Sequence, residues 1–323
     1  MTLTEERIRQ TQKSAKARFK AAERQMGAQI TKYLSGHEKT VQRLEKQVET
    51  GDMTEAEYKK QVKRQVFSGK QWKKERLQMA ETLYRTNEAC AEDLNDQMDD
   101  VYMRSYNEAS YETEKHYGRD VGTVLMTAAL LAKLKKAGKA DIPYRTVNKS
   151  KDIPWNMKRI QREVEYAVER GKDLYSIGKT SVKIISRKGF KGFETVADYV
   201  LRSVDAMGDY DALVELERLG IDIEKQWLAT LDQHTRDTHR TLDHQIQPLH
   251  DDFVVGGYTI MYPRQPSAPP EMIINCRCTM KKIFPKYQHT ENAKRRENIK
   301  DPVRKIIPSM SYREWEKWKH GKN

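Results

Sequence analysis

The sequence predicts an α+β fold that is predominantly α, with a long N-terminal helical hairpin or stalk, a helical middle and a small C-terminal α+β domain with a few short strands. Apolar residues recur at spacings of three and four through residues 1–120, which is typical of amphipathic helices. Only 10 prolines and 16 glycines occur among 323 residues, so long stretches contain no helix breaker. Past Gly220 the pattern changes to short alternating segments separated by glycine and proline, which indicates strands.

The composition fits this fold class. Hydrophobic residues make up 37% and charged residues 33% of the chain, and the mean hydropathy is −0.90. Such a polar chain suits long helices with narrow apolar stripes better than one thick core. The 16 tyrosines, 5 tryptophans and 6 phenylalanines supply packing material, which argues against disorder throughout.

The N-terminal section, residues 1–120, is predicted to be a helical stalk. Its apolar stripe is interrupted at Gly51, after which Thr54 and Glu57 have the spacing of a capping box. The stripe then resumes and is expected to end at Gly118, because glycine commonly terminates helices.

Four further sections follow the stalk. Residues 121–155 are predicted to be an apolar segment and linker, and 156–219 a helical middle with breaks near Gly189 and Gly208. Residues 220–285 are predicted to form the α+β domain, and 286–323 a basic tail with a small amphipathic element near its end. Within the α+β domain, the spacing predicts a short helix at 236–242 and strands at 225–230, 253–262 and 272–284, with Gly256-Gly257 as a bulge or turn inside 253–262.

The net charge of +13 is unevenly spread along the chain. It is +9 over residues 1–80, −7 over 81–120 and +8 over 281–323. Basic ends around an acidic block indicate either contact with a polyanion such as DNA or an acidic protein surface, or simply solvated helix faces.

The cysteine count and the N-terminus bear on the compartment. A disulfide scaffold is not expected, because the chain has only three cysteines, an odd number: Cys90, Cys276 and Cys278. The N-terminus lacks the apolar core of a signal peptide, and the most apolar run, 121–134, is shorter than the ~20 residues of a membrane span. We expect a soluble protein that is cytoplasmic when made and has no membrane partner.

Common catalytic motifs are missing from the sequence. Gly178-Lys179-Thr180 resembles the end of a phosphate-binding loop, but Asp173 stands where such a loop needs its first glycine. The sequence contains no metalloprotease, hydrolase or dinucleotide-binding motif. We therefore expect that the protein is not an enzyme.

One dense group of metal-capable residues lies between Trp227 and Cys278. His239, Cys276 and Cys278, with Asp232, Asp243 or another histidine as the fourth ligand, would make a tetrahedral zinc site. Two cysteines separated by one residue cannot form a strain-free disulfide with each other, but both can turn toward a metal at a strand end.

Two other interpretations of this group remain open. In the first, the residues form a hydrogen-bonded cluster in which Asp232, Thr235 and Arg236 cap a helix and His239 bonds to a carbonyl. In the second, cysteine and histidine form a catalytic pair, although no third orienting residue is evident.

The same residues carry a family resemblance over about residues 201–284. The order and spacing of these residues, called the signature residues below, resemble the phage Mu F-like head morphogenesis (minor capsid) domain: Trp227, Asp232, Thr235, Arg236, His239, Asp243, Asn275, Cys276, Arg277 and Cys278. The chain departs from the family pattern at His244, where the family usually has a glycine in a turn that needs positive φ.

The resemblance implies a minor structural protein of a tailed-phage head that associates with the portal during head morphogenesis in the host cytoplasm. It also implies a place in the virion, inside the head near the portal and capsid interior, with packaging alongside the DNA. The basic ends would then make non-specific DNA contacts. Two alternatives come from other classes: a DNA-binding accessory protein, and an enzyme that uses the His239/Cys276/Cys278 cluster.

Overall fold

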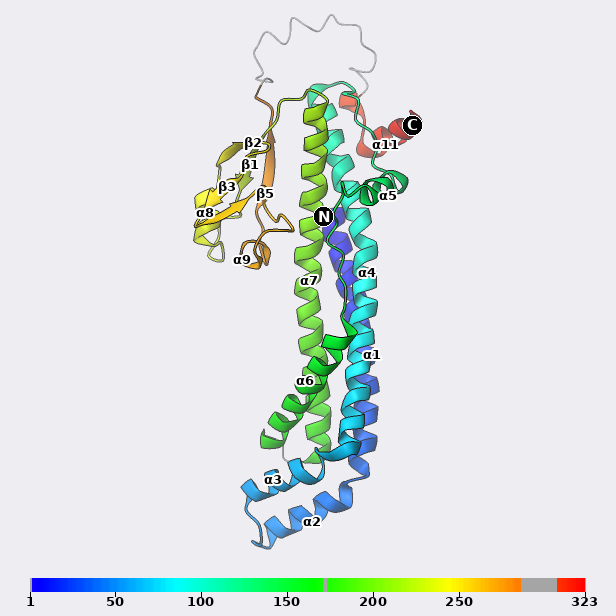
Figure 1. Ribbon diagram of the computed structural model, residues 1–323, viewed down its shortest axis with the longest axis vertical. Coiled ribbons are helices and arrows are strands. Elements are labelled where there is room, and N and C mark those ends of the chain that lie inside the picture. Colours follow the sequence, from blue (N-terminus) through cyan, green and yellow to red (C-terminus); the bar gives the residue numbers. More distant parts are fainter. Residues whose placement is uncertain (1, 171–172, 286–306, 323) are drawn as a thin grey trace, which may run out of the picture. The chain divides into compact units, whose positions relative to one another are not determined.

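The computed structural model describes residues 2–170, 173–285 and 307–322 (Figure 1). The helices are α1 (Leu3–Ser35), α2 (Glu38–Glu49), α3 (Glu55–Gln65), α4 (Gly69–Tyr117), α5 (Ala128–Lys136), α6 (Lys149–Arg170), α7 (Leu174–Arg218), α8 (Asp237–Leu242), α9 (Pro270–Ile273), the 3-10 turn η2 (Ile307–Ser309) and α11 (Tyr312–His320). The strands are β1 (Glu224–Leu228), β2 (Ile246–Pro248), β3 (Phe253–Val255), β4 (Tyr258–Ile260) and β5 (Thr279–Ile283). The predicted class, predominantly α with a few short antiparallel strands, is confirmed.

The chain forms two compact units. Unit 1 takes its described residues from 1–8, 96–144 and 197–323, and unit 2 from 9–95 and 145–196. The division falls inside α1, α4 and α7, so each of these helices contributes to both units.

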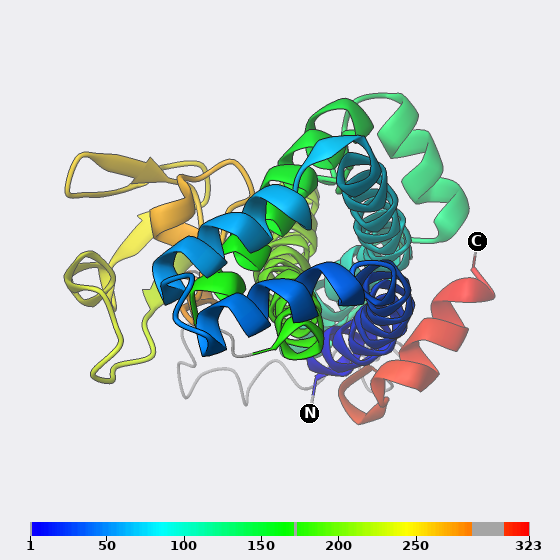
Figure 2. The ribbon, with the colours of Figure 1, turned by 90° about the horizontal axis from the view of Figure 1, so that it is seen from below.

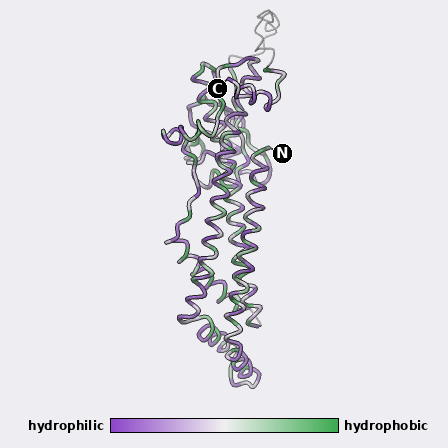
Figure 3. The backbone as a smooth tube through the Cα atoms, turned by 90° about the vertical axis from the view of Figure 1, so that its right-hand side faces the viewer, coloured by the Kyte–Doolittle hydropathy of each residue, from purple (hydrophilic) through white to green (hydrophobic). Residues whose placement is uncertain are grey.

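The core of unit 2 consists of the narrow apolar stripes that the sequence predicted. Figure 3 shows hydrophobic and hydrophilic positions alternating along the helices. The buried stripes come from α1, α4, α6 and α7 and include Met26, Ile30, Leu34, Trp72, Leu83, Ile160, Val164 and Ile177. The indole of Trp72, which is fully buried, donates a hydrogen bond to Gln161 Oε1 at 2.6 Å. This polar anchor fixes α4 against α6 within the apolar core.

The boundary predicted at Gly51 is correct, but the chain also breaks between Ser35 and Glu38, where the apolar stripe predicted a continuous helix. Thr54 and Glu57 form the expected capping box at the start of α3, and Gly51 has a φ of 78°. Helices α2 and α3 lie side by side in unit 2 (Figure 2). Gly118, with a φ of 64°, ends α4 as expected.

The breaks that we expected at Gly189 and Gly208 are wrong, because α7 runs without interruption for 45 residues. These glycines allow close packing between helices. A Cβ atom at Gly189 would lie 2.6 Å from the ring of Phe19, and one at Gly208 would lie 2.5 Å from the carbonyl oxygen of Tyr102. Gly178 belongs to the same helix, and a Cβ atom there would lie 2.7 Å from Leu34 Cδ1. The Gly178-Lys179-Thr180 run is therefore part of a helix that packs closely and forms no phosphate loop.

The segment predicted as a linker also contains helices. Helix α5 begins inside the apolar run 121–134, and α6 begins at Lys149 with Pro154 inside it. Within the described chain, no helix combines the length and the apolar character that crossing a membrane would require.

Unit 1 contains two small antiparallel sheets. One has the strand order β2-β1-β5, with Trp227 opposite Met280, and the other is the β3–β4 hairpin. Gly256 and Gly257, with φ values of 57° and 83°, make the turn that splits the predicted strand 253–262 into this hairpin. The predicted strand 272–284 is correct only at its end, because Pro270 starts the short helix α9 and β5 begins after the cysteines.

The C-terminal helix α11 packs against α4 within unit 1. A capping box between Ser311 and Glu314 starts it, as the amphipathic pattern suggested, and Trp315 is fully buried. Lys319 Nζ lies 2.8 Å from a carboxylate oxygen of Glu114, and both side chains are buried. Residues 286–306 of the predicted basic tail lie outside the described part of the chain.

Candidate functional site

The core of the small α+β region surrounds a buried histidine. Strand β1 places Trp227 in this core, and helix α8 points His239 at it, so that the two rings meet edge to face with centroids 5.7 Å apart. Only 2% of the His239 surface is exposed. The apolar residues Leu242, Phe253 and Met272 pack in the same cluster and exclude water from the imidazole.

The two nearby cysteines converge on this histidine. Asn275, with a φ of 57°, makes the tight turn between α9 and β5, and both Cys276 and Cys278 face inward after it. His239 Nδ1 lies 3.2 Å from Cys278 Sγ and 3.6 Å from Cys276 Sγ. The ligand atoms of the three residues all lie within 4.8 Å of one another, so the structure brings together the histidine and both cysteines that the sequence singled out.

The electrostatics of the cluster favour one thiolate. Hydrogen bonds from the Cys278 thiol and from His239 lower the pKa of Cys276, although burial opposes the shift. The pKa of Cys278 is raised, because its proton is held by Cys276 and because the thiol is buried. His239 Nε2 is buried and has no hydrogen-bond partner among the described residues. The cluster is therefore a soft, negatively polarised group next to a buried ring nitrogen that has no hydrogen-bond partner among the described residues.

Asp232, the expected fourth ligand, lies outside this group of three and pairs with Arg277. Two hydrogen bonds of 2.5 and 2.7 Å join the Arg277 guanidinium to its carboxylate, which also accepts the backbone N–H of His234. The hydrogen bonds from Arg277 and the His234 backbone hold the pKa of Asp232 below its usual range. This carboxylate closes the loop before α8 and joins it to the turn between the cysteines.

Other signature residues also fasten loops. The Arg236 guanidinium donates to the carbonyl of Ile274 at 2.6 Å, and Asp243 accepts the backbone N–H of Ala229 at 2.8 Å. The hydroxyl of Thr235 accepts a hydrogen bond from the backbone N–H of Asp232 and donates one to the Asp232 carboxylate. The polar signature residues thus hold the segments from which His239 and the cysteines project.

Two buried cations that sequence reasoning missed support this region. The Arg264 guanidinium, 8% exposed, donates to the carbonyl of Cys276 at 3.1 Å, and no sequence pattern pointed to it. The ammonium group of Lys225, which is fully buried, donates to the carbonyl of Leu249 and contacts Met261 Sδ. Lys225 stands two residues before Trp227 on β1, so strand alternation could have predicted its burial.

The other histidines of the dense segment do not join the cluster. His234, His244 and His250 are exposed, and His250 pairs with Glu217 at 2.6 Å. His244 has a φ of 62°, so the turn that needs positive φ forms here without a glycine.

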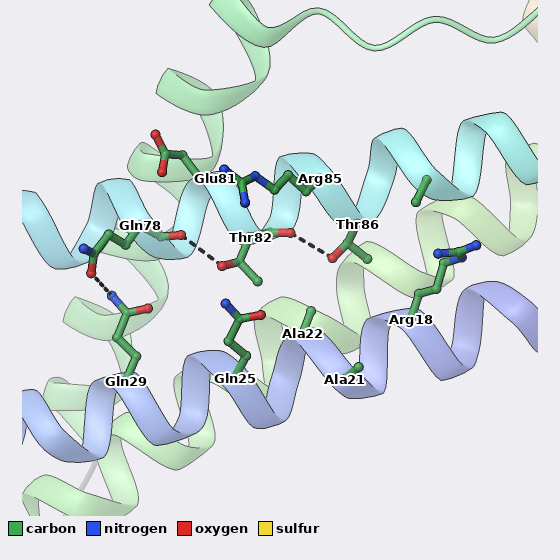
Figure 4. A pocket seen from close by; sticks show the side chains of 11 residues that line it. Arg18, Ala21, Ala22, Gln25, Gln29, Gln78, Glu81, Thr82, Arg85 and Thr86 are labelled. Carbon is green, nitrogen blue, oxygen red and sulfur yellow. Dashed lines mark hydrogen bonds between the residues drawn. The ribbon is translucent and has the colours of Figure 1, made fainter.

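Two concavities also lie on the surface of the protein, one in each unit. In unit 1 a pocket of about 520 Å³ is lined by Asp198, Arg202, His234, Arg236, Asn275 and Arg277, and the arginines Arg202 and Arg277 are already paired with carboxylates. In unit 2 a groove of about 480 Å³ lies between α1 and α4 (Figure 4). Its lining is mainly amides, hydroxyls and alanines, and Gln29 bonds to Gln78 across it. The His239/Cys276/Cys278 group therefore remains the candidate site.

Comparison with known proteins identifies a domain. The family model described as "Phage Mu protein F like protein" matches residues 158–281, which confirms the resemblance carried by the signature residues. The match begins before residue 201, so it includes parts of α6 and α7 as well as the small sheets.

Two curated proteins are similar to parts of the chain. The minor head protein of Bacillus phage SPP1 is 24% identical over 235 residues, which is 70% of this chain and 71% of that protein. An NAD(+)–arginine ADP-ribosyltransferase of Enterococcus faecalis is 43% identical over 65 residues, which is 20% of this chain and 13% of that enzyme. No solved structure matches the chain.

Proposed function

Since the chain carries a phage Mu protein F like domain at residues 158–281, we propose that it is a minor structural protein of a tailed-phage head that docks on the portal during head morphogenesis. One observation supports this most strongly. The similarity to the SPP1 minor head protein extends over 235 residues, well beyond the domain itself. A role in phage head structure or assembly follows from both comparisons, and docking on the portal is the finer part of the proposal.

The burial of the candidate site favours a structural role over catalysis. His239, Cys276 and Cys278 are each no more than 4% exposed, so a substrate could not reach the thiolate without unfolding its surroundings. The similarity to the ADP-ribosyltransferase covers too little of that enzyme to transfer its activity.

We further propose that the helices of residues 1–219 make the docking contact. They carry Trp155, Tyr166 and Tyr175, which are 43–59% exposed. Exposed aromatic side chains are enriched at protein interfaces, where they supply large contact areas. The Arg159 guanidinium lies over the ring of Trp155, with its central carbon 5.4 Å from the ring centroid, and helps to hold it at the surface.

Co-expression of the full chain with a tagged portal protein tests the proposal. We expect the chain to co-purify with the portal oligomer and to occur in few copies in purified heads by mass spectrometry. The Trp155→Ala/Tyr166→Ala variant should lose co-purification, whereas Val254→Ala, at a 63% exposed position on β3, should keep it. A chain that neither binds the portal nor occurs in heads would contradict the proposal.

Non-specific DNA contact through the basic ends is a further part of the proposed role. Residues 1–80 carry a net charge of +9, which phosphates would attract. The affinity for a labelled duplex should therefore fall steeply between about 50 and 200 mM salt. Such a fall is expected when ~6 or more basic side chains contact phosphates and release counterions. Tight binding that survives such salt would instead favour the DNA-binding accessory protein.

A further inference from the structure

The three buried side chains of α8 and the α9–β5 turn point their ligand atoms at one common position. His239 Nδ1 lies 3.2 and 3.6 Å from the two sulfurs, and the three ligand atoms all lie within 4.8 Å of one another. The residues come from two segments almost forty positions apart in sequence. Their convergence is therefore produced by the fold and not by local spacing alone.

The distances match the edges of a zinc tetrahedron. With Zn–S bonds of about 2.3 Å and Zn–N bonds of about 2.0 Å at tetrahedral angles, a sulfur and a nitrogen ligand lie about 3.5 Å apart. The separations of 3.2 and 3.6 Å lie on either side of this value. A zinc ion would fit after shifts of a few tenths of an ångström.

Hydrogen bonds alone stabilise this cluster poorly. Sulfur is a weak donor and a weak acceptor, so His239 Nδ1 gains little from the two cysteines. His239 Nε2 is buried without a hydrogen-bond partner among the described residues. A buried polar group without a good partner destabilises the fold, and ligation of a metal through Nδ1 would offset that cost.

We infer that His239, Cys276 and Cys278 bind one structural zinc ion that joins α8 to the turn before β5. Two thiolates and an imidazole select zinc over oxygen-preferring cations such as magnesium or calcium. The carbonyl of Cys276 is held by Arg264, which fixes the direction of the first cysteine from outside the cluster.

The protein supplies three ligands to this ion from the described residues. Asp232 is bound by Arg277, and the Asp243 carboxylate accepts the backbone N–H of Ala229, so neither carboxylate turns inward. A fourth ligand that these side chains do not supply would complete the tetrahedron. The inference does not depend on the proposed role in the phage head.

Metal analysis of the full-length protein, purified under reducing conditions without added chelator, tests the inference. We expect about one zinc per chain, and loss of zinc to a strong chelator should lower the melting temperature. Replacement by Co²⁺ should give the ligand-field and thiolate charge-transfer bands of a tetrahedral site. These measurements need no variant, so they decide the matter even where a substitution prevents folding.

Matched variants assign the ligands. His239→Ala and Cys278→Ser should each lose the zinc, whereas His250→Ala and Cys90→Ser should retain it. Cys90 is a fair control because it is equally buried but lies in unit 2. Wild-type protein that binds no zinc after growth with added zinc, and whose melting temperature ignores the chelator, would overturn the inference. If the Cys90→Ser control lost as much zinc as the ligand variants, the assignment of the ligands would be overturned.

Discussion

His244 is a residue whose backbone conformation conflicts with its identity. It sits at a φ of 62° between α8 and β2, and its N–H donates to the carbonyl of Trp227 at 2.8 Å. A side chain with a Cβ in this left-handed region costs about 1 kcal/mol. We expect His244→Gly to raise the free energy of unfolding by about 1 kcal/mol, measured by urea denaturation. His244→Ala keeps the Cβ and should show no such gain; equal effects of the two substitutions would contradict the strain.

Lys225 is a buried cation whose stability contribution depends on pH. Burial lowers its pKa from the usual 10.5 to about 8. Between these values the unfolded chain binds more protons than the folded chain, so the free energy of unfolding rises with pH. Wild-type protein should therefore gain stability relative to Lys225→Met between pH 8 and pH 10.5. Urea denaturation at both ends of this window tests it, with the exposed Lys281→Met as control; a difference independent of pH would refute it.

At the residue scale, sequence reasoning located the three cluster residues but not what surrounds them. His239 and the Asn275–Cys278 run stand out because metal-capable types gather there. Asp232 looked equally suitable as a ligand, since its partner Arg277 is 45 positions away and ion pairs at that separation leave no sequence pattern. The hydrogen bond from the Arg264 guanidinium to the Cys276 carbonyl also left no sequence pattern, because any residue type offers such a carbonyl.

Among the elements, α7 depends on glycines for its packing. A Cβ at Gly208 would lie 2.5 Å from the carbonyl oxygen of Tyr102, a backbone atom that cannot move aside easily. Gly208→Ala should lower the free energy of unfolding by about 1–3 kcal/mol, as overpacking does.

Gly192 provides the matched control in the same helix, because a Cβ there would meet nothing within 4 Å. Gly192→Ala should raise stability by about 0.5–1 kcal/mol, since alanine is the better helix former. Thermal denaturation of both variants gives the comparison. Shifts of the same sign would show that the contact at Gly208 does not limit the approach of α7 to α4.

Periodicity predicted the helices well because each buries a continuous apolar stripe, as α1 and α4 do. It misplaced the breaks in α7, since a glycine that ends a helix and one that admits a neighbouring side chain look alike in sequence. The strand expected at 272–284 failed for a similar reason. Its alternation continued through Asn275, but Pro270–Ile273 form the helix α9 and Asn275 takes a left-handed backbone conformation.

At the scale of the whole molecule, part of the uneven charge is neutralised internally. Within unit 1, Lys282 pairs with Glu112 and Asp209, while Lys319 pairs with Glu114 and Asp120. The basic C-terminal region and the acidic stretch 81–120 are thus partners of each other in the fold. Among the described residues, less of the C-terminal charge is available to DNA than the sequence suggested, and the same acidic stretch also pairs with Arg7 and Arg18 of residues 1–80.

Lys319 also fixes α11 to α4 across about two hundred residues of sequence. Lys319 is 3% exposed, and Glu114 is fully buried and accepts hydrogen bonds from Lys319, Trp315 and Thr123. Lys319→Met would leave a buried carboxylate uncompensated, so we expect a loss of about 3–5 kcal/mol. Hydrogen exchange should show α11 losing protection, whereas Lys322→Met, at a 46% exposed side chain, should leave it protected. Unchanged exchange in Lys319→Met would refute this role.

The domain match and the two units do not share their boundaries, and this has an evolutionary consequence. Residues 158–196 of the matched segment lie in unit 2, where Ile160 and Val164 pack in one core with Met26 and Trp72, and residues 197–281 lie in unit 1. Recombination that imported a gene segment for residues 158–281 alone would supply only part of each core. The remaining core residues of the recipient protein would then lack their packing partners. Such genes should therefore be inherited with their N-terminal helices, as a single block.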